Sequence, residues 1–302
     1  MSEKKGNGIC MFCYNNEQLD YVKFALIAAN YAKRSMDNID VSLITDDGTV
    51  AWMKQSHDQE LIDKTFDQIL IHPVEYESNP RKHMDSPWTE FNAQFTNSNK
   101  HMVYEYTPYE RTLLIDTDYL ITNNFYNYIF NTDEPIALHR YAQYIGNEVP
   151  YRNEIHLNDS GINHWWSTII YFDQSEESKL FFDIWTHVKD HWEYYSLLYQ
   201  YPRQLFRTDF CVSIACQMMN GFNNDNFIHD FCATPLLNMD QKDDIAEINT
   251  LNDYVFLKHN RREQWKNILC RYTDTNLHIM NKRALDRKFP DIIDMLKEGE
   301  NV

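Results

Sequence analysis

The chain has 302 residues, of which 43% are hydrophobic, and its formal net charge is −17. This length and apolar fraction are typical of one large α/β domain with a sizeable core. The negative charge argues against a dedicated binder of duplex nucleic acid, because such proteins neutralise phosphates with a basic surface. No stretch approaches the ~20 apolar residues of a membrane-spanning helix and no signal peptide is recognised, so we expect a cytoplasmic protein.

The first third of the chain alternates between strand-like and helix-like patterns. Short apolar runs predict strands over 9–14, 41–45 and 68–72, and helical spacing predicts helices over 19–34 and 61–66. The segment Asp46-Asp47-Gly48 is typical of a turn. Such alternation predicts a parallel sheet covered by helices, in which ligands bind at the carboxyl ends of the strands.

The rest of the chain continues with mixed elements. After a polar segment over 85–106 that leads into a helix, we expect strands over 111–115, 135–138, 165–172 and 255–258 and helices over 176–195, 207–219 and 291–297. The segment 139–164 is predicted to be a long polar and aromatic loop, and loops of this length are usually functional or mobile. Cys10 and Cys13 lie within the first apolar run, so we expect buried reduced thiols rather than a redox pair.

The central chemical signal is Asp116-Thr117-Asp118, which directly follows the apolar run Leu113-Leu114-Ile115. In an extended segment residues i and i+2 point to the same face, so the carboxylates of Asp116 and Asp118 repel each other unless a cation lies between them. Mn²⁺ and Mg²⁺ prefer oxygen ligands and share them with phosphates and water. The pattern therefore predicts a metal site, with a solvated strand end as the alternative.

A strand, an Asp-x-Asp pair and an apolar continuation resemble the GT-A glycosyltransferases, especially the family 8-like enzymes, over roughly residues 9–282. The resemblance implies an α/β fold with a GT-A-type, Rossmann-like mixed sheet flanked by helices in a single domain. It implies a nucleotide-binding half over 1–122, an acceptor-binding half over 123–285 and a C-terminal helix over 286–302. The implied reaction moves a hexosyl or pentosyl group from a nucleotide-sugar, expected to be a UDP-sugar, to an acceptor hydroxyl with Mn²⁺ or Mg²⁺.

The resemblance also carries roles for residues on the donor side. It places Tyr14, Asn15 and Asp46 at the strand ends that hold the nucleoside, with core packing and turn capping as the alternatives. His278 matches the late histidine that joins Asp116 and Asp118 in the metal shell, and Lys282 matches the lysine that meets the diphosphate. The family usually has a glycine, a longer spacing between His and Lys, and a Pro-Trp pair after the Lys, and none of these is present here.

On the acceptor side, Ser167 and Thr168 fall where the family contacts the donor sugar, and Trp165 or Trp166 is expected to form an apolar platform for a sugar. Asp209 matches an acidic residue of the family. In an inverting enzyme this carboxylate would deprotonate the acceptor hydroxyl, and in a retaining enzyme it would position the sugar. A plain helix cap at Asp209 is the alternative.

Other functions fit the pattern less well. Haloacid dehalogenase-like phosphatases need Thr or Val two residues after the second Asp, where this chain has Leu120. A binding module that has lost its metal would not need the intact Asp pair. The acceptor is expected to be a glycan, a protein, a small molecule or, as in phage-type enzymes, a hydroxymethylated DNA base. A DNA acceptor would require a basic cluster beside the cleft, drawn from Arg203, Arg207, Lys258, Arg261 and Arg262.

Overall fold

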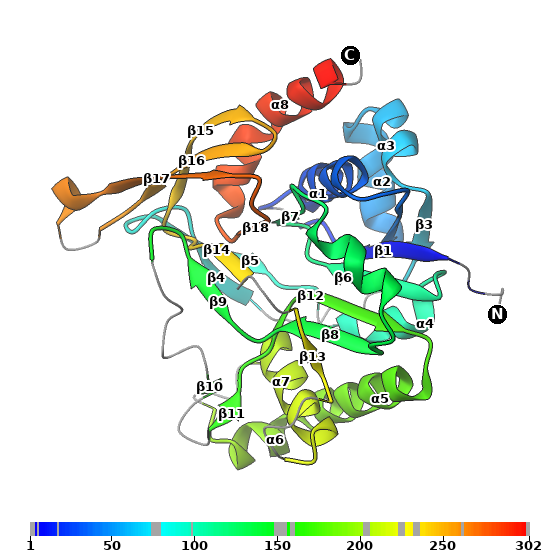
Figure 1. Cartoon of the computed structure of the whole chain (residues 1–302). Helices are drawn as coiled ribbons and strands as arrows, with labels where there is room; N and C mark the ends of the chain where they lie inside the picture. The colour runs from blue at the N-terminus through cyan, green and yellow to red at the C-terminus, as the bar shows by residue number, and fades with distance from the viewer. Residues whose placement is uncertain are drawn as a thin grey trace.

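The computed structural model describes residues 4, 6–16, 18–73, 80–97, 99–147, 156–157, 161–201, 206–222, 227–231, 236–260 and 263–299. A seven-stranded mixed sheet forms its centre (Figure 1). In spatial order its strands are β13 (His229–Asp230), β8 (Ile136–His139), β12 (Trp166–Asp173), β6 (Arg111–Ile115), β1 (Asn7–Phe12), β2 (Asp40–Thr45) and β3 (Gln68–Ile71). Strands β6, β1, β2 and β3 are parallel, whereas β12 runs antiparallel to both of its neighbours.

Helices cover both faces of this sheet because its strands are apolar on both sides. In β1, Ile9 and Met11 face one buried cluster, and Cys10 and Phe12 face the other. The first cluster is closed by α1 (Tyr21–Ser35), α2 (Asp47–Ser56), α3 (Gln59–Thr65) and α8 (Lys282–Gly299). The second is closed by α4 (Val103–Tyr106), α5 (Glu176–Asp190), α6 (Trp192–Leu198) and α7 (Thr208–Met219) (Figure 1). The expected α/β class, a mixed sheet flanked by helices in a single domain, is confirmed.

Smaller sheets surround the carboxyl edge of the parallel strands. A four-stranded sheet has the order β7 (Tyr119–Leu120), β18 (Leu277–Ile279), β14 (Leu236–Met239) and β9 (Ala142–Tyr144). The remaining strands form a hairpin of β4 (Pro80–Met84) and β5 (Glu90–Gln94), a pair of β10 (His156–Leu157) and β11 (Ile162–Asn163), and an antiparallel sheet of β15 (Asp244–Thr250), β16 (Asp253–Lys258) and β17 (Ile268–Thr273). Short 3₁₀ turns cover Lys100–Met102, Phe125–Asn131 and Gln264–Lys266.

Several elements differ from the sequence predictions. Asp46 does not begin a turn but caps α2, because its carboxylate accepts a hydrogen bond from the Thr49 amide at 2.6 Å. The helix expected over 176–195 is divided at His191 into α5 and α6. The last helix begins at Lys282 rather than near residue 286 or 291, and Pro290 lies inside it although proline usually ends a helix. No helix of the described residues is long and apolar enough to cross a membrane.

Candidate active site

Asp116 and Asp118 lie where the central sheet meets the four-stranded sheet. β6 ends at Ile115, and the Asp116 amide donates to the Thr168 carbonyl of β12 at 2.9 Å. Two residues later the Asp118 carbonyl accepts from the Ile279 amide of β18 at 2.9 Å. The Asp-x-Asp segment is therefore tied by its backbone to one sheet on each side.

The same strand β18 brings His278 to the two carboxylates. Ligand atoms of Asp116, Asp118 and His278 all lie within 4.8 Å of one another, and His278 Nε2 is 3.5 Å from Asp118 Oδ1. Asn238 lies opposite His278 in the β14–β18 register, and its Oδ1 accepts from His278 Nδ1 at 3.0 Å. With its proton on Nδ1, the ring directs the Nε2 lone pair towards the carboxylates, as metal-binding histidines do. Two carboxylates and one oriented imidazole are a donor set that suits Mn²⁺.

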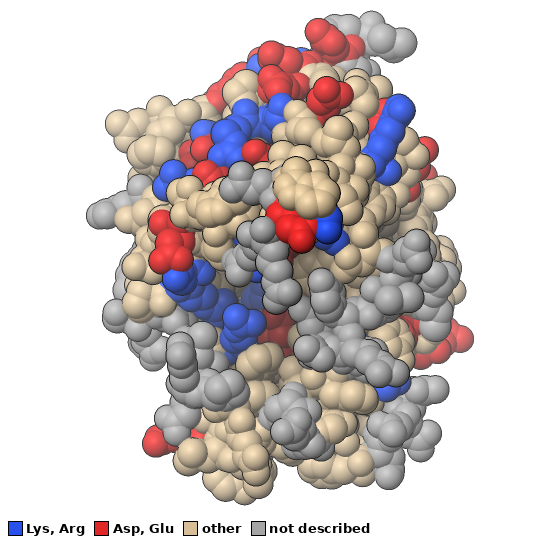
Figure 2. All heavy atoms as spheres, turned by 90° about the vertical axis from the view of Figure 1, so that its left-hand side faces the viewer, with Lys and Arg blue, Asp and Glu red and all other residues tan. Residues whose placement is uncertain are grey.

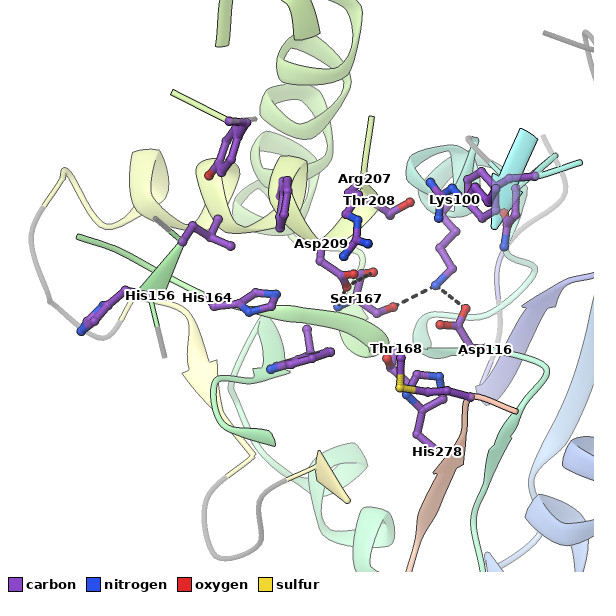
Figure 3. A pocket seen from close by; sticks show the side chains of 18 of the residues that line it. Lys100, Asp116, His156, His164, Ser167, Thr168, Arg207, Thr208, Asp209 and His278 are labelled. Atoms are coloured by element: carbon purple, nitrogen blue, oxygen red, sulfur yellow. Dashed lines mark hydrogen bonds and ion pairs between the residues drawn. The ribbon is translucent and has the colours of Figure 1, made fainter. Parts of the chain in front are cut away.

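Two lysines hold these carboxylates. Lys282, the first residue of α8, contacts Asp118 Oδ2 at 2.5 Å. Lys100 pairs with Asp116 and donates to the Ser167 carbonyl at 3.0 Å (Figure 3), and the Lys100 residue is only 4% exposed. Lys100 was missed by the sequence analysis, because it lies in a polar segment with no local pattern that marks it.

The environment shifts the two carboxylates in opposite directions. Burial opposes ionisation of Asp118, but the Lys282 charge and its hydrogen bond outweigh burial and hold the pKa of Asp118 well below its usual range. Burial and the nearby Asp118 charge raise the pKa of Asp116, which Lys100 offsets only in part. The site therefore holds one carboxylate that is firmly ionised and one that gains from an additional cation.

Two connected hollows of about 480 and 490 Å³ meet at Asp116 and His278. One hollow is lined by Tyr14, Asp118 and Lys282, among others. We call it the donor-side hollow, after the role that the sequence resemblance implies for these residues. The aromatic hollow is lined by a ring-rich set: Tyr144, His156, His164, Trp166, Tyr201 and Phe210. The carboxyl end of β1 points to the left of Figure 1, and Figure 2 shows that face, where acidic side chains lie in a hollow beside a group of Lys and Arg side chains.

The three residues expected to hold a nucleoside are placed differently. Tyr14 lines the donor-side hollow beside Phe12, but it is only 3% exposed and belongs to the second buried cluster, which agrees with the core-packing alternative. The Asn15 side chain accepts from the Val22 amide at 3.1 Å, and Asp46 caps α2, so neither lines either of these two hollows. Both side chains stabilise the start of a helix, which for Asp46 is close to the capping alternative, and nucleoside binding by Asn15 and Asp46 stays a prediction.

On the other side of Asp116, Ser167, Thr168 and Asp209 all line the aromatic hollow. Ser167 holds Asp209 Oδ1 with its amide at 2.8 Å and its hydroxyl at 2.6 Å. Burial opposes ionisation of Asp209, but His164 and the Ser167 hydrogen bonds hold the pKa of Asp209 below its usual range. Asp209 is therefore an ionised carboxylate in a fixed position.

Of the two tryptophans, Trp166 lines the aromatic hollow and Trp165 does not. The Trp166 ring stacks on His164, with centroids 4.5 Å apart, and Tyr201 stacks on Phe210 at 4.6 Å. The two pairs are neighbours, because the His164 and Phe210 ring centroids are 6.3 Å apart. Flat apolar rings of this kind suit the C–H faces of a sugar. His164, Tyr201 and Phe210 were not predicted from the sequence, because aromatic residues are frequent throughout this chain.

The basic residues proposed for a DNA acceptor do not form one cluster in the described structure. Arg207 lines both hollows, whereas Lys258 donates to the Ile145 carbonyl at 2.8 Å and lines neither. Arg203, Arg261 and Arg262 lie outside the described residues. A further arginine, Arg81 of β4, enters both hollows and was missed by the sequence analysis.

No protein-family model matches the sequence, and no curated protein matches it. Among solved structures the chain is similar to the glycosyltransferase GlyE of Streptococcus pneumoniae TIGR4, with 10% identity and a TM-score of 0.42, over 74% of this chain but only 45% of that one. It is also similar to mouse xyloside xylosyltransferase 1, with 11% identity and a TM-score of 0.42, over 69% of this chain and 81% of that one.

A third similar structure is the galactosyltransferase LgtC, with 10% identity and a TM-score of 0.49, over 95% of each chain. All three of these proteins are named as glycosyltransferases. Identities near 10% and TM-scores below 0.5 do not by themselves show a shared activity. The geometry of the cavity must therefore support any functional conclusion.

Proposed function

We propose that this chain is a metal-dependent glycosyltransferase of the GT-A type that moves a sugar from a nucleotide-sugar, expected to be a UDP-sugar, to an acceptor hydroxyl. The observation that carries the proposal is the convergence of Asp116, Asp118 and His278 on one point of a cavity, with ligand atoms within 4.8 Å. The donor-side hollow, which is lined by Lys282 and Tyr14, and the aromatic hollow both reach this point. This arrangement provides separate room for a donor and an acceptor.

The donor-side hollow supplies groups for a nucleoside diphosphate. Asp116, Asp118 and His278 would hold Mn²⁺ or Mg²⁺, which when bound stabilises the negative charge that develops on the diphosphate leaving group. The Lys282 ammonium lies against Asp118 and would add to the stabilisation of that charge. The Tyr14 ring lines the same hollow, where a nucleobase would stack.

The transfer breaks the bond between the anomeric carbon and a phosphate oxygen and forms a bond to the acceptor oxygen, whose proton must be removed. An efficient general base has a pKa near the working pH. Because the pKa of Asp209 is held below its usual range, we infer that Asp209 orients the sugar and stabilises its developing positive charge. The departing diphosphate then takes the acceptor proton, which is the retaining route that the family 8 pattern favours.

The proposal is tested by titrating the protein with a panel of nucleotide-sugars with and without Mn²⁺, using calorimetry for binding and release of nucleoside diphosphate for turnover. We expect metal-dependent binding of one donor, lost in Asp118→Ala. Asp63→Ala is the matched control, because Asp63 is an exposed carboxylate on α3 whose partner is Gln59. If no donor binds in a metal-dependent manner, the transferase proposal is wrong. Metal-independent binding of a donor without turnover would favour a binding module.

A further inference from the structure

Two arginines enter the cavity from separate elements. Arg81 lies on β4 and Arg207 directly precedes α7, and both side chains line the donor-side hollow and the aromatic hollow. Neither has a carboxylate at ion-pair distance within the part of the chain that the structure describes. The cavity therefore contains two guanidinium groups that form no ion pair in the described structure, although the carboxylates of Asp116 and Asp209 line the same hollows.

The contacts that Arg81 does make leave part of its guanidinium unused. Its Nη2 donates to the Phe206 carbonyl at 3.0 Å, and its guanidinium lies 3.3 Å from the centroid of the Phe95 ring. Its Nε is buried and has no hydrogen-bond partner in the described structure. Arg207 lies over the Phe210 ring at 5.7 Å. Both planar groups therefore contact rings, and in the described structure Arg81 uses one of its guanidinium nitrogens, Nη2, as a hydrogen-bond donor.

Like charges in one cavity oppose each other, and burial adds to the cost. Burial and the nearby Arg207 charge lower the pKa of Arg81 to about 10, and the carboxylates of Asp209 and Asp116 offset this only in part. The Asp209 carboxylate is already held at Oδ1 by Ser167. A bound oxyanion removes this repulsion, and the planar guanidinium fork matches carboxylate and phosphate better than any other side chain does.

The two arginines are placed differently from the cation expected to meet the diphosphate. Lys282 lines the donor-side hollow only, whereas Arg81 and Arg207 also line the aromatic hollow, beside the stacked rings of His164 and Trp166. A ligand that places an anionic group at the arginines from the aromatic hollow would pack the rest of its structure against aromatic rings. A sugar ring fits this description.

We propose that Arg81 and Arg207 form a second oxyanion site, which binds a carboxylate or phosphate carried by a sugar where the two hollows meet. This inference rests on the proposed function for the identity of the sugar and narrows the substrate class to acidic or phosphorylated sugars. The anion belongs either to the transferred sugar of the donor or to the acceptor, and the experiment separates these two sources.

The experiment compares charged and neutral sugars by calorimetry. The donor arm uses UDP-glucuronate against UDP-glucose with Mn²⁺, and the acceptor arm uses glucose 6-phosphate against glucose without nucleotide. We expect the charged member of one pair to bind about tenfold or more tightly than its neutral counterpart, as hydrogen bonds to charged groups imply. The arm in which this preference occurs identifies the source of the anion.

The variant Arg81→Gln/Arg207→Gln should lose this preference and retain its affinity for UDP alone. Arg283→Gln is the matched control, because the Arg283 guanidinium also lies over a ring, at 4.2 Å from the Phe91 centroid, but outside both hollows. If the double Gln variant melts early, Arg81→Lys/Arg207→Lys replaces it. This variant keeps the charges but loses the planar fork, and it should show a reduced preference.

Three results overturn the second oxyanion site. The first is equal binding of charged and neutral sugars by the wild type in both arms. The second is a folded Gln variant that still prefers charged sugars over neutral ones. An equal loss of affinity for UDP alone and for the charged sugars would assign the arginines to the diphosphate and leave the proposed function intact. Conversely, if glucose 6-phosphate binds through the arginines but no nucleotide binds, the second site holds and the transferase proposal fails.

Discussion

Replacing Asn238 tests whether His278 is oriented to bind a metal. The His278 Nδ1 donates to Asn238 Oδ1 at 3.0 Å, and Asn238 is fully buried. Asn238→Leu removes the acceptor that the described structure gives to that proton, so the ring loses the contact that selects its tautomer. Losing such an outer contact typically lowers metal affinity by about 10- to 100-fold, or ~1.4–2.7 kcal/mol.

The assay follows free Mn²⁺ by electron paramagnetic resonance during titration of the wild type, Asn238→Leu, Asn238→Asp and His278→Ala. We expect Asn238→Leu to bind Mn²⁺ more weakly than the wild type, and Asn238→Asp to bind it at least as tightly, because a carboxylate accepts the same hydrogen bond. The melting temperature of each variant is measured in parallel, since an unsatisfied buried donor costs ~1–3 kcal/mol of stability.

A purely structural role of Asn238 predicts a different pattern. Asn238→Leu would then melt at a lower temperature but would bind Mn²⁺ with wild-type affinity. That result, or wild-type affinity in His278→Ala, would refute the assignment of His278 to the metal shell.

Three further predictions concern stability and pH. Burial raises the pKa of Asp243 to about 6, so the native state is destabilised as the pH rises through that value. Asp243→Asn should therefore raise the free energy of unfolding at pH 8, by at most ~3 kcal/mol, but not at pH 4. A pH-independent difference would contradict this. Gly8→Ala places a Cβ 2.2 Å from the buried Tyr109 ring and should cost ~1–3 kcal/mol in denaturant unfolding. Ser167→Ala removes a hydrogen bond that holds Asp209 ionised, so the acid limb of the transfer-rate profile should move to higher pH, and an unmoved limb would exclude Asp209 from that titration.

The parts of the fold that were predictable have strong local signals. The strand Arg111–Ile115 has the predicted bounds, because an uninterrupted apolar run directly precedes two acidic residues. The alternation of strands and helices over the first third predicted the parallel arrangement of β1, β2 and β3. Two segments whose residues are compatible with more than one structure were misinterpreted. Asp46 caps a helix, although Asp46-Asp47-Gly48 is typical of a turn. Pro290 lies inside the last helix, which was expected to begin after it.

The candidate site was predictable only in part, because only some of its residues have a local signal in the sequence. The pair Asp116 and Asp118 has a local signature, and His278 and Lys282 followed from a resemblance in their order. Lys100 and Arg81 enter the cavity from segments in which nothing in the local sequence distinguishes them from other basic residues. Their importance depends on where those segments pack.

By itself the sequence determined the burial of the central strands, because their apolar runs are uninterrupted, and the common face of the two carboxylates, because residues i and i+2 of an extended chain point the same way. The tertiary structure decided which distant groups meet those carboxylates. The pairing of β18 with β7 and β14 brings His278 to Asp118 and Asn238 to His278. The packing of separate segments around the cavity brings Arg81 near Arg207. Strand register and packing are set by burial across the whole chain, so no local pattern reveals these contacts.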